Sequence, residues 1–551
     1  MFRKDMDLRL GLIACTDGTR IINPTWSQES IQQLKNPTIP EINIAIEKLI
    51  RSGHAWIFFW DNTTCELPEK SAIIDMINNT RADVLHNTPH AYSHQLRQLL
   101  ISIDPLHLFY SHVDDAIKTI SWESTFGLML IRASLFHDVG TFLPHFSSRA
   151  ASTLAWGRQA SRQGAIMEEE PKLPKPTLNK ELTYRDIFSI IKYISGLKWM
   201  IWAAVYACLR HPIHIFKIVF SLRDIHQEIP ISFHRDHPLQ STNKNQDTIE
   251  NMGISVVIPS LHRYKNLETT LICIANQTVK AIEIIIVDQE SDHAKVRDIL
   301  NKFSNLPLRI ISLADPGQCR SRNAGIVSST QQFIMLMDDD IEVPDNLFEN
   351  LSRRLKETSA DAVCGIHHEI TAAPSGNLRG QILASDVMPG GNVLIRRSIL
   401  EKSGLFDLAY DRLSRADADL AFRIRQQGGL IIVDRNIAII HHHESHGGLR
   451  IFGARNVTNA ISRRSYFKRN LLSPSEIYLA KRFFLQNASR CLIIQRLLAT
   501  LYVTNHPHPL LRCLAGIISL PFSIIATWHT WWLGKKLLST YPKIPMLSNR
   551  A

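Results

Sequence analysis

Apolar runs that alternate with helical patterns dominate the chain from Ile254 onward. The run ISVVIPS at 254–260 is typical of a buried strand, and the stretch NLETTLICIANQT at 266–278 has the spacing of a helix. A second strand-like run, AIEIIIVD, begins at residue 281, and a third, FIMLM, covers 333–337. Strands that alternate with helices predict an α/β fold with a parallel sheet, whose ligands bind at the carboxyl ends of the strands.

The chain also resembles itself at an offset of 264 residues. GLMLIRAS, which begins at Gly127, aligns without a gap on GNVLIRRS, which begins at Gly391, and the alignment continues downstream. Upstream, HAWIFFWDN at 54–62 resembles QQFIMLMDD at 331–339, because each is an apolar strand that runs into an acidic turn. We therefore expect two related domains in tandem.

The first copy lacks acidic residues that the second copy has. Thr153 and Ala155 stand where the second copy has Asp417 and Asp419. The segment from the first strand to the acidic turn is also shorter, as though one nucleotide-binding βαβ unit were missing. We expect the first copy to be degenerate and non-catalytic, with a role in acceptor recognition or pairing.

Two polar stretches predict the domain boundaries. Residues 224–250 have no apolar periodicity and mark a linker, and the proline-rich, charged stretch at 167–180 ends an earlier folded unit. The predicted order is a degenerate domain at 1–166, an amphipathic helical segment at 167–223, a linker at 224–250, a catalytic domain at 251–450 and a helical, membrane-associating region at 451–551.

Two hydrophobic tracts raise the question of a membrane. The tract at 197–222 is interrupted by Arg210 and His211, and each apolar piece is too short to span about 30 Å of hydrocarbon, so we expect interfacial amphipathic helices. The tract at 513–534 is almost long enough to span, but it contains Pro521 and His529. A true span, a monotopic anchor and a buried helix pair all remain open for this second tract.

Composition and charge narrow the class of partner. The chain is 45% hydrophobic and 21% charged, which is typical of globular proteins, and its net charge of +11 favours an anionic partner. Basic residues lie beside tryptophans and aliphatic residues, and no nucleic-acid motif is visible, so we expect a membrane surface and no nucleic acid. Eight cysteines without CxxC spacing indicate reduced thiols, and the N-terminal stretch does not match a signal peptide. We expect a cytoplasmic protein at the inner face of the membrane.

Three successive aspartates, Asp338, Asp339 and Asp340, follow the strand-like run at 333–337. Neighbouring carboxylates repel each other unless a cation or several donors lie between them. Mg2+ and Mn2+ bind a few carboxylates and complete their coordination with substrate phosphate oxygens. The triplet therefore predicts a divalent metal site; the alternative is a capped turn, in which aspartate is common.

Asp417 offers a second kind of chemistry. It lies at the start of a predicted helix that ends at Gly428 and Gly429, and a carboxylate there can take a proton from an attacking hydroxyl. The alternative is complementation of the helix dipole by an acidic first turn. Asp288, which follows the second strand, and Arg322 and Asn323, which begin another helix, are weaker candidates for ligand and phosphate contacts when taken alone.

The histidine-rich stretch HHHESHGG at 441–448 invites a zinc interpretation. Consecutive histidines on an extended segment point to alternate sides, however, and no cysteine completes a ligand set. We favour one histidine, His443, as the last metal ligand or phosphate contact of the site, with a solvated polar loop as the alternative.

Together these motifs resemble the family 2 glycosyltransferases with a GT-A fold. That family's motifs, strand-Pro, V-D-x-x-S, R-N-x-G, D-x-D, G-G-N and E-D-x-D-L-x-x-R, are matched by Val256 to Pro259, Val287 to Ser291, Arg322 to Gly325, Asp338 to Asp340, Gly390 to Asn392 and Ala416 to Arg423. The resemblance implies that Asp288 contacts the nucleobase, that Asp338 contacts the ribose and the metal-bound diphosphate, that Asp340 binds the metal and that Asp417 is the base. It places Pro259, Arg322, Asn323, Asp339, Gly391 and Asn392 in the donor site. Gln289, Glu290 and Ala416 depart from the pattern.

The predicted reaction is inverting, metal-dependent transfer of a sugar from a nucleotide-sugar donor to a hydroxyl of a saccharide or a lipid-linked saccharide. Two other classes stay open. A nucleotidyltransferase would also use an Asp-rich metal site, but the turn after 254–259 has no glycines to hold phosphates. A non-catalytic sugar- or lipid-binding scaffold would have no reason to assemble the acids of the second half.

Overall fold

A computed structural model describes the fold of most of the chain. It describes residues 9–17, 26, 30–88, 94–107, 113–177, 182–223, 225, 252–290, 294–369, 382–385, 388–442, 451–452, 457, 459–501 and 506–547. The predicted linker at 224–250, apart from residue 225, and the candidate ligand His443 lie outside these ranges.

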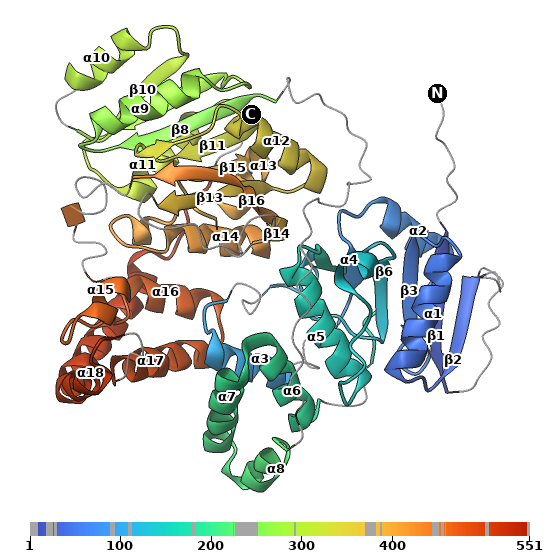
Figure 1. Ribbon diagram of the computed structural model, residues 1–551. Helices are drawn as coiled ribbons and strands as arrows, with labels where there is room; N and C mark the ends of the chain where they lie inside the picture. The colour runs from blue at the N-terminus through green and yellow to red at the C-terminus, as the bar shows by residue number, and fades with distance from the viewer. Residues whose placement is uncertain are drawn as a thin grey trace, which may run out of the picture.

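The first half is a seven-stranded sheet with helices packed on it (Figure 1). The strands are β1 (Leu10–Thr16), β2 (Ile31–Lys35), β3 (Trp56–Asp61), β4 (Val84–His86), β5 (Thr119–Ile120), β6 (Leu128–Arg132) and β7 (Met167–Glu169). The helices are α1 (Ile39–Arg51), α2 (Lys70–Asn78), α3 (His94–Ile103), α4 (Leu135–Val139) and α5 (Arg149–Arg162). Strands β1 and β3 are buried along their whole length, as their apolar sequences predict.

The second half is a nine-stranded sheet with its own helices. The strands are β8 (Ile254–Ser260), β9 (Glu283–Asp288), β10 (Leu308–Ser312), β11 (Phe333–Met337), β12 (Ile341–Glu342), β13 (Ala362–Glu369), β14 (Ile382–Ala384), β15 (Asn392–Arg396) and β16 (Ile431–His441). The helices are α9 (Tyr264–Ala275), α10 (Ala294–Lys302), α11 (Gln318–Ser328), α12 (Leu347–Thr358), α13 (Arg397–Ser403) and α14 (Ala416–Gln426). The predicted runs at 254–260, 281–288 and 333–337 are all strands of this sheet. The sheet is mixed and not purely parallel, because β15 runs antiparallel to both β11 and β13.

The two sheets share one topology. The first contains the order β2-β1-β3-β6-β4-β7, and the second contains the order β9-β8-β11-β15-β13-β16. Every pairing in one order has the same direction as its counterpart in the other: parallel, parallel, antiparallel, antiparallel and parallel. Beyond the shared strands, β10 extends only the second sheet, on the side where the sequence predicted a missing unit.

The first domain extends beyond the predicted boundary at residue 166. Met167–Glu169 forms β7, which pairs with β4 inside the first sheet, so this part of the prediction was wrong. The charged sequence read as a domain break, but Glu168 is buried and its charge is balanced by Arg81 and Lys118. Ion pairing with residues distant in sequence thus keeps an acidic segment inside the fold.

Helices follow each sheet. After the first come α6 (Tyr184–Ser195), α7 (Leu197–Arg210) and α8 (Ile215–Phe220); after the second come α15 (Asn459–Arg464), α16 (Pro474–Phe483), α17 (Gln486–Leu501) and α18 (Pro509–Thr540). Helix α18 continues through Pro521. Within the described residues it is the one helix long and apolar enough to cross a membrane by length and composition, so it is a candidate membrane anchor.

Ionic groups join the two halves. The guanidinium of Arg81 contacts the carboxylates of Glu168 at 2.7 Å and Asp361 at 3.0 Å, and it donates to the carbonyl of Gly428 at 3.0 Å. In the opposite direction, Arg425 of α14 in the second half donates a hydrogen bond to the carbonyl of Ile120 in the first half, at 3.1 Å. Both contacts lie at the carboxyl end of α14, so the first half holds one end of the helix that begins at Ala416.

Candidate functional site

The candidate site lies where neighbouring parallel strands end. Strands β9, β8 and β11 are adjacent and parallel, so their carboxyl ends lie on one edge of the sheet. Asp288 ends β9, and Asp338 directly follows β11. The sheet therefore brings together acidic residues that are about 50 positions apart in the sequence, as expected for an α/β fold.

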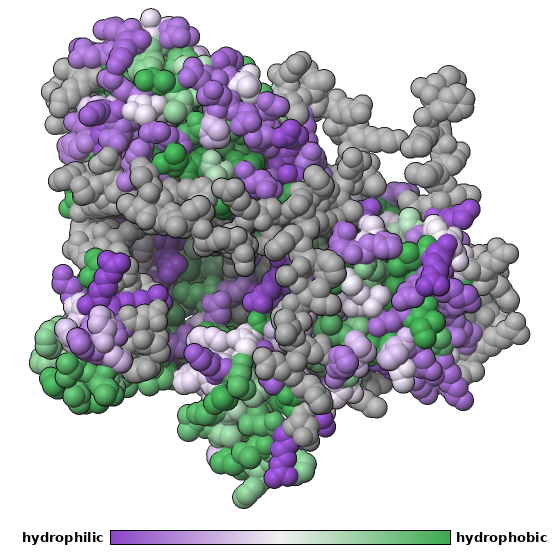
Figure 2. Space-filling model, in the orientation of Figure 1, coloured by the Kyte–Doolittle hydropathy of each residue, from purple (hydrophilic) through white to green (hydrophobic). Residues whose placement is uncertain are grey.

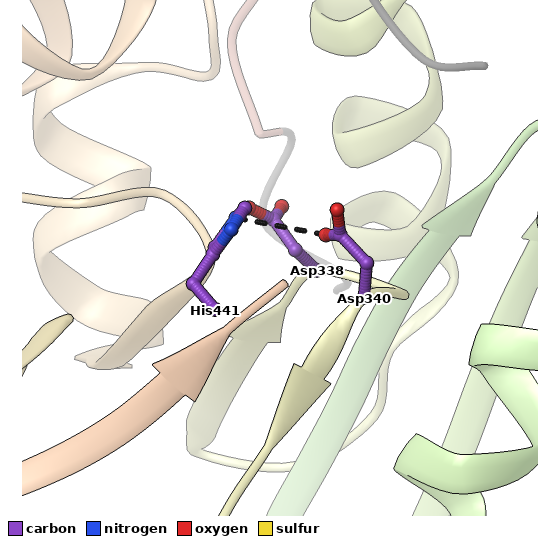
Figure 3. Close-up of side chains that lie close together, drawn as sticks. All are labelled: Asp338, Asp340 and His441. Atoms are coloured by element: carbon purple, nitrogen blue, oxygen red, sulfur yellow. Dashed lines mark ion pairs between the residues drawn. The ribbon is translucent and has the colours of Figure 1, made fainter. Parts of the chain in front are cut away.

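Asp338, Asp340 and His441 form a cluster that can hold a metal ion (Figure 3). One ligand atom from each lies within 4.8 Å of the others. His441 Nε2 is 3.6 Å from Asp338 Oδ2 and 3.5 Å from Asp340 Oδ1. The antiparallel pairing of Ile341 with His441, between β12 and β16, delivers the histidine to the aspartates. Two carboxylates and an imidazole with ligand atoms this close are a donor set that suits a divalent metal ion.

The carboxylates of this cluster lie among cationic groups. Burial raises the pKa of Asp338, but the nearby imidazole of His441 and guanidinium of Arg322 outweigh burial and hold that pKa below its usual range. Asp340 is 3.0 Å from Arg263 Nη1. The ionised form of Asp338, which a cation needs as a ligand, is therefore favoured at neutral pH.

Asp339, predicted as a donor-site residue, makes contacts on the inside of the domain. Its carboxylate accepts a hydrogen bond from Ser260 at 2.8 Å and lies 3.3 Å from Arg263 Nη1. Burial raises the pKa of Asp339 to about 7, and the attraction of Arg263 reduces that effect. Asp339 is not part of the metal cluster, and it ties the acidic turn to the end of β8.

Arg322 links the metal cluster to Asp417. Its Nη2 is 2.9 Å from Asp338 Oδ1, and its Nη1 is 3.9 Å from Asp417 Oδ1. The arginine side chain is only 9% exposed, whereas the Asp417 side chain is 42% exposed. The arginine is thus an internal bridge, whereas the Asp417 side chain at the start of α14 is partly exposed.

Two glycines make room for these acids. A Cβ on Gly390 would lie 2.5 Å from Asp417 Oδ1, and a Cβ on Gly391 would lie 2.1 Å from Asp338 Oδ2. Asp338 also donates its backbone N–H to the carbonyl of Gly391 at 3.2 Å. The close approach of Asp338 thus leaves no room for a side chain at residue 391, and the donor-site role of Gly391 stays a prediction.

The next residue, Asn392, carries a buried amide. Among the described residues, neither polar atom of that amide has a hydrogen-bond partner. A buried amide that makes no hydrogen bond is destabilising by about 1–3 kcal/mol. The side chain therefore offers a donor and an acceptor for a ligand beside Gly391.

Asn323 holds a loop in place. It accepts a hydrogen bond from the backbone N–H of Phe406 and donates one to its carbonyl, each at 2.8 Å. In this structure the amide of Asn323 is engaged in this reciprocal pair, and its contact with the sugar donor stays a prediction. The amino end of α11, proposed for phosphate, is likewise filled by Asp411, which accepts from the N–H groups of Cys319 and Arg320 at 2.9 Å each.

The remaining predicted residues lie on the same edge. Asp288 is fully buried and accepts a hydrogen bond from the hydroxyl of Tyr264 at 2.8 Å. Pro259, one residue before the end of β8, pairs with Val287 of β9. Arg322 thus links Asp417 to Asp338, which clusters with Asp340, and Asp288 and Pro259 lie on neighbouring strands.

Two residues of the site escaped the sequence analysis. The sequence analysis chose His443, which lies outside the described residues, and not His441. The position of His441 depends on its pairing with Ile341, 100 positions away, which no local pattern reveals. Arg263 contacts both Asp339 and Asp340. The signal for Arg263 was present, since it is a basic residue just after a buried strand.

Among the described residues of the first half, no such cluster stands at the corresponding place. Strand β3 pairs with β6 in the way that β11 pairs with β15: Trp56 lies opposite Arg132, and Phe333 lies opposite Arg396. In this register Asp61, at the end of β3, corresponds to Asp338, which follows β11. Thr63 then takes the position of Asp340, and its hydroxyl donates to Asp61 Oδ1 at 2.7 Å. Only one of the two carboxylates remains.

Comparisons with known proteins point to one kind of domain. Residues 255–404 match the family model for Glycosyl transferase family 2. The cholesterol galactosyltransferase of Borreliella burgdorferi is 27% identical over 121 residues, which are 22% of this chain and 34% of that protein. The amylovoran biosynthesis glycosyltransferase AmsB of Erwinia amylovora is 31% identical over 109 residues, which are 19% of this chain and 36% of that protein. The matches thus span about a third of the length of each of these relatives.

Among solved structures, S. aureus TarS in complex with UDP-GlcNAc aligns with 52% of this chain and 92% of its own, at 13% identity and a TM-score of 0.36. The family match confirms the glycosyltransferase domain predicted for the second half. The mixed α/β sheet agrees with the predicted fold class.

Proposed function

We propose that this chain, which carries a family 2 glycosyltransferase domain, transfers a sugar from a nucleoside-diphosphate sugar to an acceptor hydroxyl with inversion at the anomeric carbon. One observation carries the proposal: Arg322 bridges a buried acidic metal cluster and a more exposed aspartate, Asp417. The sugar donor would bind at the metal cluster and the acceptor hydroxyl at Asp417, and the two sites would be separated only by the guanidinium of Arg322.

Asp338, Asp340 and His441 would hold Mg2+ or Mn2+, which when bound neutralises charge on the departing nucleoside diphosphate. Asp288 and the amide of Asn392 provide hydrogen-bonding groups on the donor side. On the acceptor side, Asp417 takes the hydroxyl proton as the new glycosidic bond forms and the bond to the diphosphate oxygen breaks. A single displacement of this kind needs no covalent intermediate.

The acceptor we propose is a saccharide or lipid-linked saccharide of the cell envelope, handled at the inner face of the cytoplasmic membrane. The names of the two relatives, one for transfer to cholesterol and one for amylovoran biosynthesis, support lipid and polysaccharide acceptors. We propose that the first half, in which Thr63 replaces the second carboxylate, is non-catalytic and supports the second half. Its contacts with the end of α14 favour that role.

The test is release of nucleoside diphosphate from a panel of UDP-, GDP- and dTDP-sugars with Mn2+ or Mg2+. The parent chain is compared with Asp340→Ala and Asp417→Asn, and with Asp315→Asn as a matched control, because the Asp315 side chain is 76% exposed and bonds only a partly exposed Arg320. Metal-dependent release that is lost in the first two variants and kept in the control is the expected result.

Two outcomes would overturn the proposal. Release of pyrophosphate from a nucleoside triphosphate would indicate a nucleotidyltransferase. Donor binding that is unchanged in all three variants, without turnover, would indicate a binding scaffold.

A further inference from the structure

Most of the large apolar side chains that are exposed on the described helices belong to two separate segments. Helices α7 and α8, with the turn between them, expose Leu197, Trp199, Ile201, Val205, Leu209, Ile213, Phe216, Val219 and Phe220. Helix α18 exposes Leu510, Leu511, Leu514, Ile517, Ile518, Phe522, Ile524, Ile525, Trp528 and Trp532. Figure 2 shows both hydrophobic surfaces on the lower side of the molecule. Apolar patches of this extent mark a surface that binds another apolar phase.

The two surfaces belong to one connected layer of helices. Helix α3 packs against both α7 and α17. Trp202 of α7 donates to the carbonyl of Ser102 at 2.9 Å, and Gln495 of α17 donates to the carbonyl of Ile103 at 2.8 Å. Tyr206 of α7 also lies 3.4 Å from the sulfur of Cys491 of α17. Helix α17 in turn packs against α18, so the two apolar surfaces are held in a fixed relation.

Helix α18 lies along the protein. Its buried face is made of small and polar residues: Arg512, Ala515, Gly516, Ser523, Thr527 and Gly534. A Cβ on Gly516 would lie 2.4 Å from the carbonyl of Thr500 in α17, and a Cβ on Gly534 would lie 2.7 Å from Ile477 in α16. These two contacts are separated by about 27 Å of helix at 1.5 Å per residue, nearly the thickness of a bilayer core.

Both ends of α18 return to the protein. At its start, Arg512 is buried and donates to the carbonyl of Thr500 at 3.0 Å. After its end, Pro545 accepts a hydrogen bond from the backbone N–H of Leu405 in the second sheet domain at 2.8 Å, and Leu547 is buried. A helix that crossed a bilayer would place these two ends on opposite sides of it. The docked ends are incompatible with that placement.

The charge of these segments fits an anionic surface. Neither 197–223 nor the chain from residue 477 to its last residue contains an aspartate or a glutamate. Lysines stand beside the tryptophans at one end of α18, with Lys535 over Trp531 at 4.3 Å and Lys536 over Trp532 at 5.7 Å. Tryptophan beside lysine is the composition of a membrane–water boundary, and basic residues there are attracted to anionic headgroups.

We propose that α7, α8 and α18 together form one membrane-binding face, which inserts into a single leaflet of a bilayer that contains anionic lipids, with α18 parallel to the membrane plane. This inference does not depend on the transfer reaction, since it rests on helices outside the sheet domains. It also assigns α18 to one leaflet, although α18 is long and apolar enough to span both.

The first test is flotation of the full chain with vesicles of neutral lipid, and of neutral lipid mixed with about a third anionic lipid. We expect binding to the mixed vesicles. The variants Phe216→Glu with Phe220→Glu, and Ile518→Glu with Phe522→Glu, should each reduce the partition coefficient at least tenfold, on the order of the cost of a carboxylate in the bilayer. Ile44→Glu is the matched control, because Ile44 is 66% exposed on α1 in the first sheet domain.

A gentler variant, Lys535→Gln with Lys536→Gln, guards against misfolding of the glutamate variants. It should lower binding to anionic vesicles on the order of tenfold and leave the residual binding to neutral vesicles unchanged. Equal binding of the parent chain to both vesicles, or no loss in any variant, would overturn the proposal.

The second test asks which side of the membrane holds the end of the chain. An epitope placed after Ala551 is exposed to protease added outside sealed vesicles that carry the full protein. If α18 lies in one leaflet, the epitope is removed together with the sheet domains. An epitope that survives until detergent opens the vesicles would show that α18 spans, and would overturn the in-plane placement.

Discussion

Replacing Arg81 by methionine removes the side chain that ties the first half to the second. Its guanidinium contacts the carboxylates of Glu168 at 2.7 Å and Asp361 at 3.0 Å, and donates to the carbonyls of Ser359 at 2.9 Å and Gly428 at 3.0 Å. Methionine is unbranched and flexible and preserves much of the apolar volume, so the change acts mainly through the lost charge and hydrogen bonds.

The loss of folding stability in Arg81→Met depends on which partners Glu168 keeps. The side chain of Glu168 is 1% exposed, and removal of one partner of a buried pair costs about 3–5 kcal/mol. Lys118 still contacts Glu168 at 2.9 Å, which favours the lower end, about 3 kcal/mol. Because Arg81 also holds Gly428, two residues beyond the end of α14, we expect slower sugar transfer as well.

The pH dependence identifies the cause. Burial raises the pKa of Glu168, but Arg81 and Lys118 outweigh it and bring the pKa below the ordinary value of 4.5. A depressed carboxyl pKa contributes stability that is fully present above pH 4.5 and is lost as the pH falls through the folded-state value. The difference between parent and variant should therefore be larger at pH 7 than at pH 3, because the contribution of ionised Glu168 is lost as the pH falls below 4.5.

The assay is urea unfolding followed by tryptophan fluorescence at several pH values. Arg51→Met is the control, because Arg51 pairs only with Glu47 and both side chains are mostly exposed, at 82% and 56%. Its unfolding midpoint should match that of the parent chain. An Arg81→Met chain with the midpoint of the parent, or a difference that persists undiminished at pH 3, would refute the reasoning.

Three further predictions concern the site and the first domain. His441→Ala should weaken Mn2+ binding by at least about 10- to 100-fold in titration calorimetry, because loss of a direct ligand should cost no less than loss of an outer-shell partner. His442→Ala should not weaken it, because the His442 imidazole contacts Glu342 at 2.8 Å and not the cluster. Gly391→Ala should abolish metal-dependent transfer with little change in the thermal midpoint, because its Cβ would lie 2.1 Å from an Asp338 oxygen. Burial, above all, raises the pKa of Glu169 from 4.5 to about 7, so the folded state keeps that proton and the parent chain should lose stability as the pH rises from 4.5 through 7. Glu169→Gln should remove that loss in urea unfolding at pH 5 and 8, and an unchanged slope would contradict the assignment.

The sequence predicted those features that depend on interactions between residues close together in the chain. The strands at 254–260 and 333–337 were visible because buried strands need continuous apolar runs, and the acids at their ends stood out against that background. The contribution of His441 was not visible, since it depends on pairing with Ile341 in a distant strand. The strand at Met167–Glu169 was read as a break because glutamates are rarely buried, and only Arg81 and Lys118, far away in sequence, make its burial possible.

The ionic contact between the halves also has a consequence for biosynthesis. Arg81 and Asp361 are 280 positions apart, so at roughly 5–20 residues per second the ribosome makes the second partner about 15–60 s after the first. During that interval the first domain can fold with this face open to water. An apolar face of the same extent would invite aggregation while it waited, whereas Arg81 and its carboxylate neighbours are hydrated until the rest of the chain arrives.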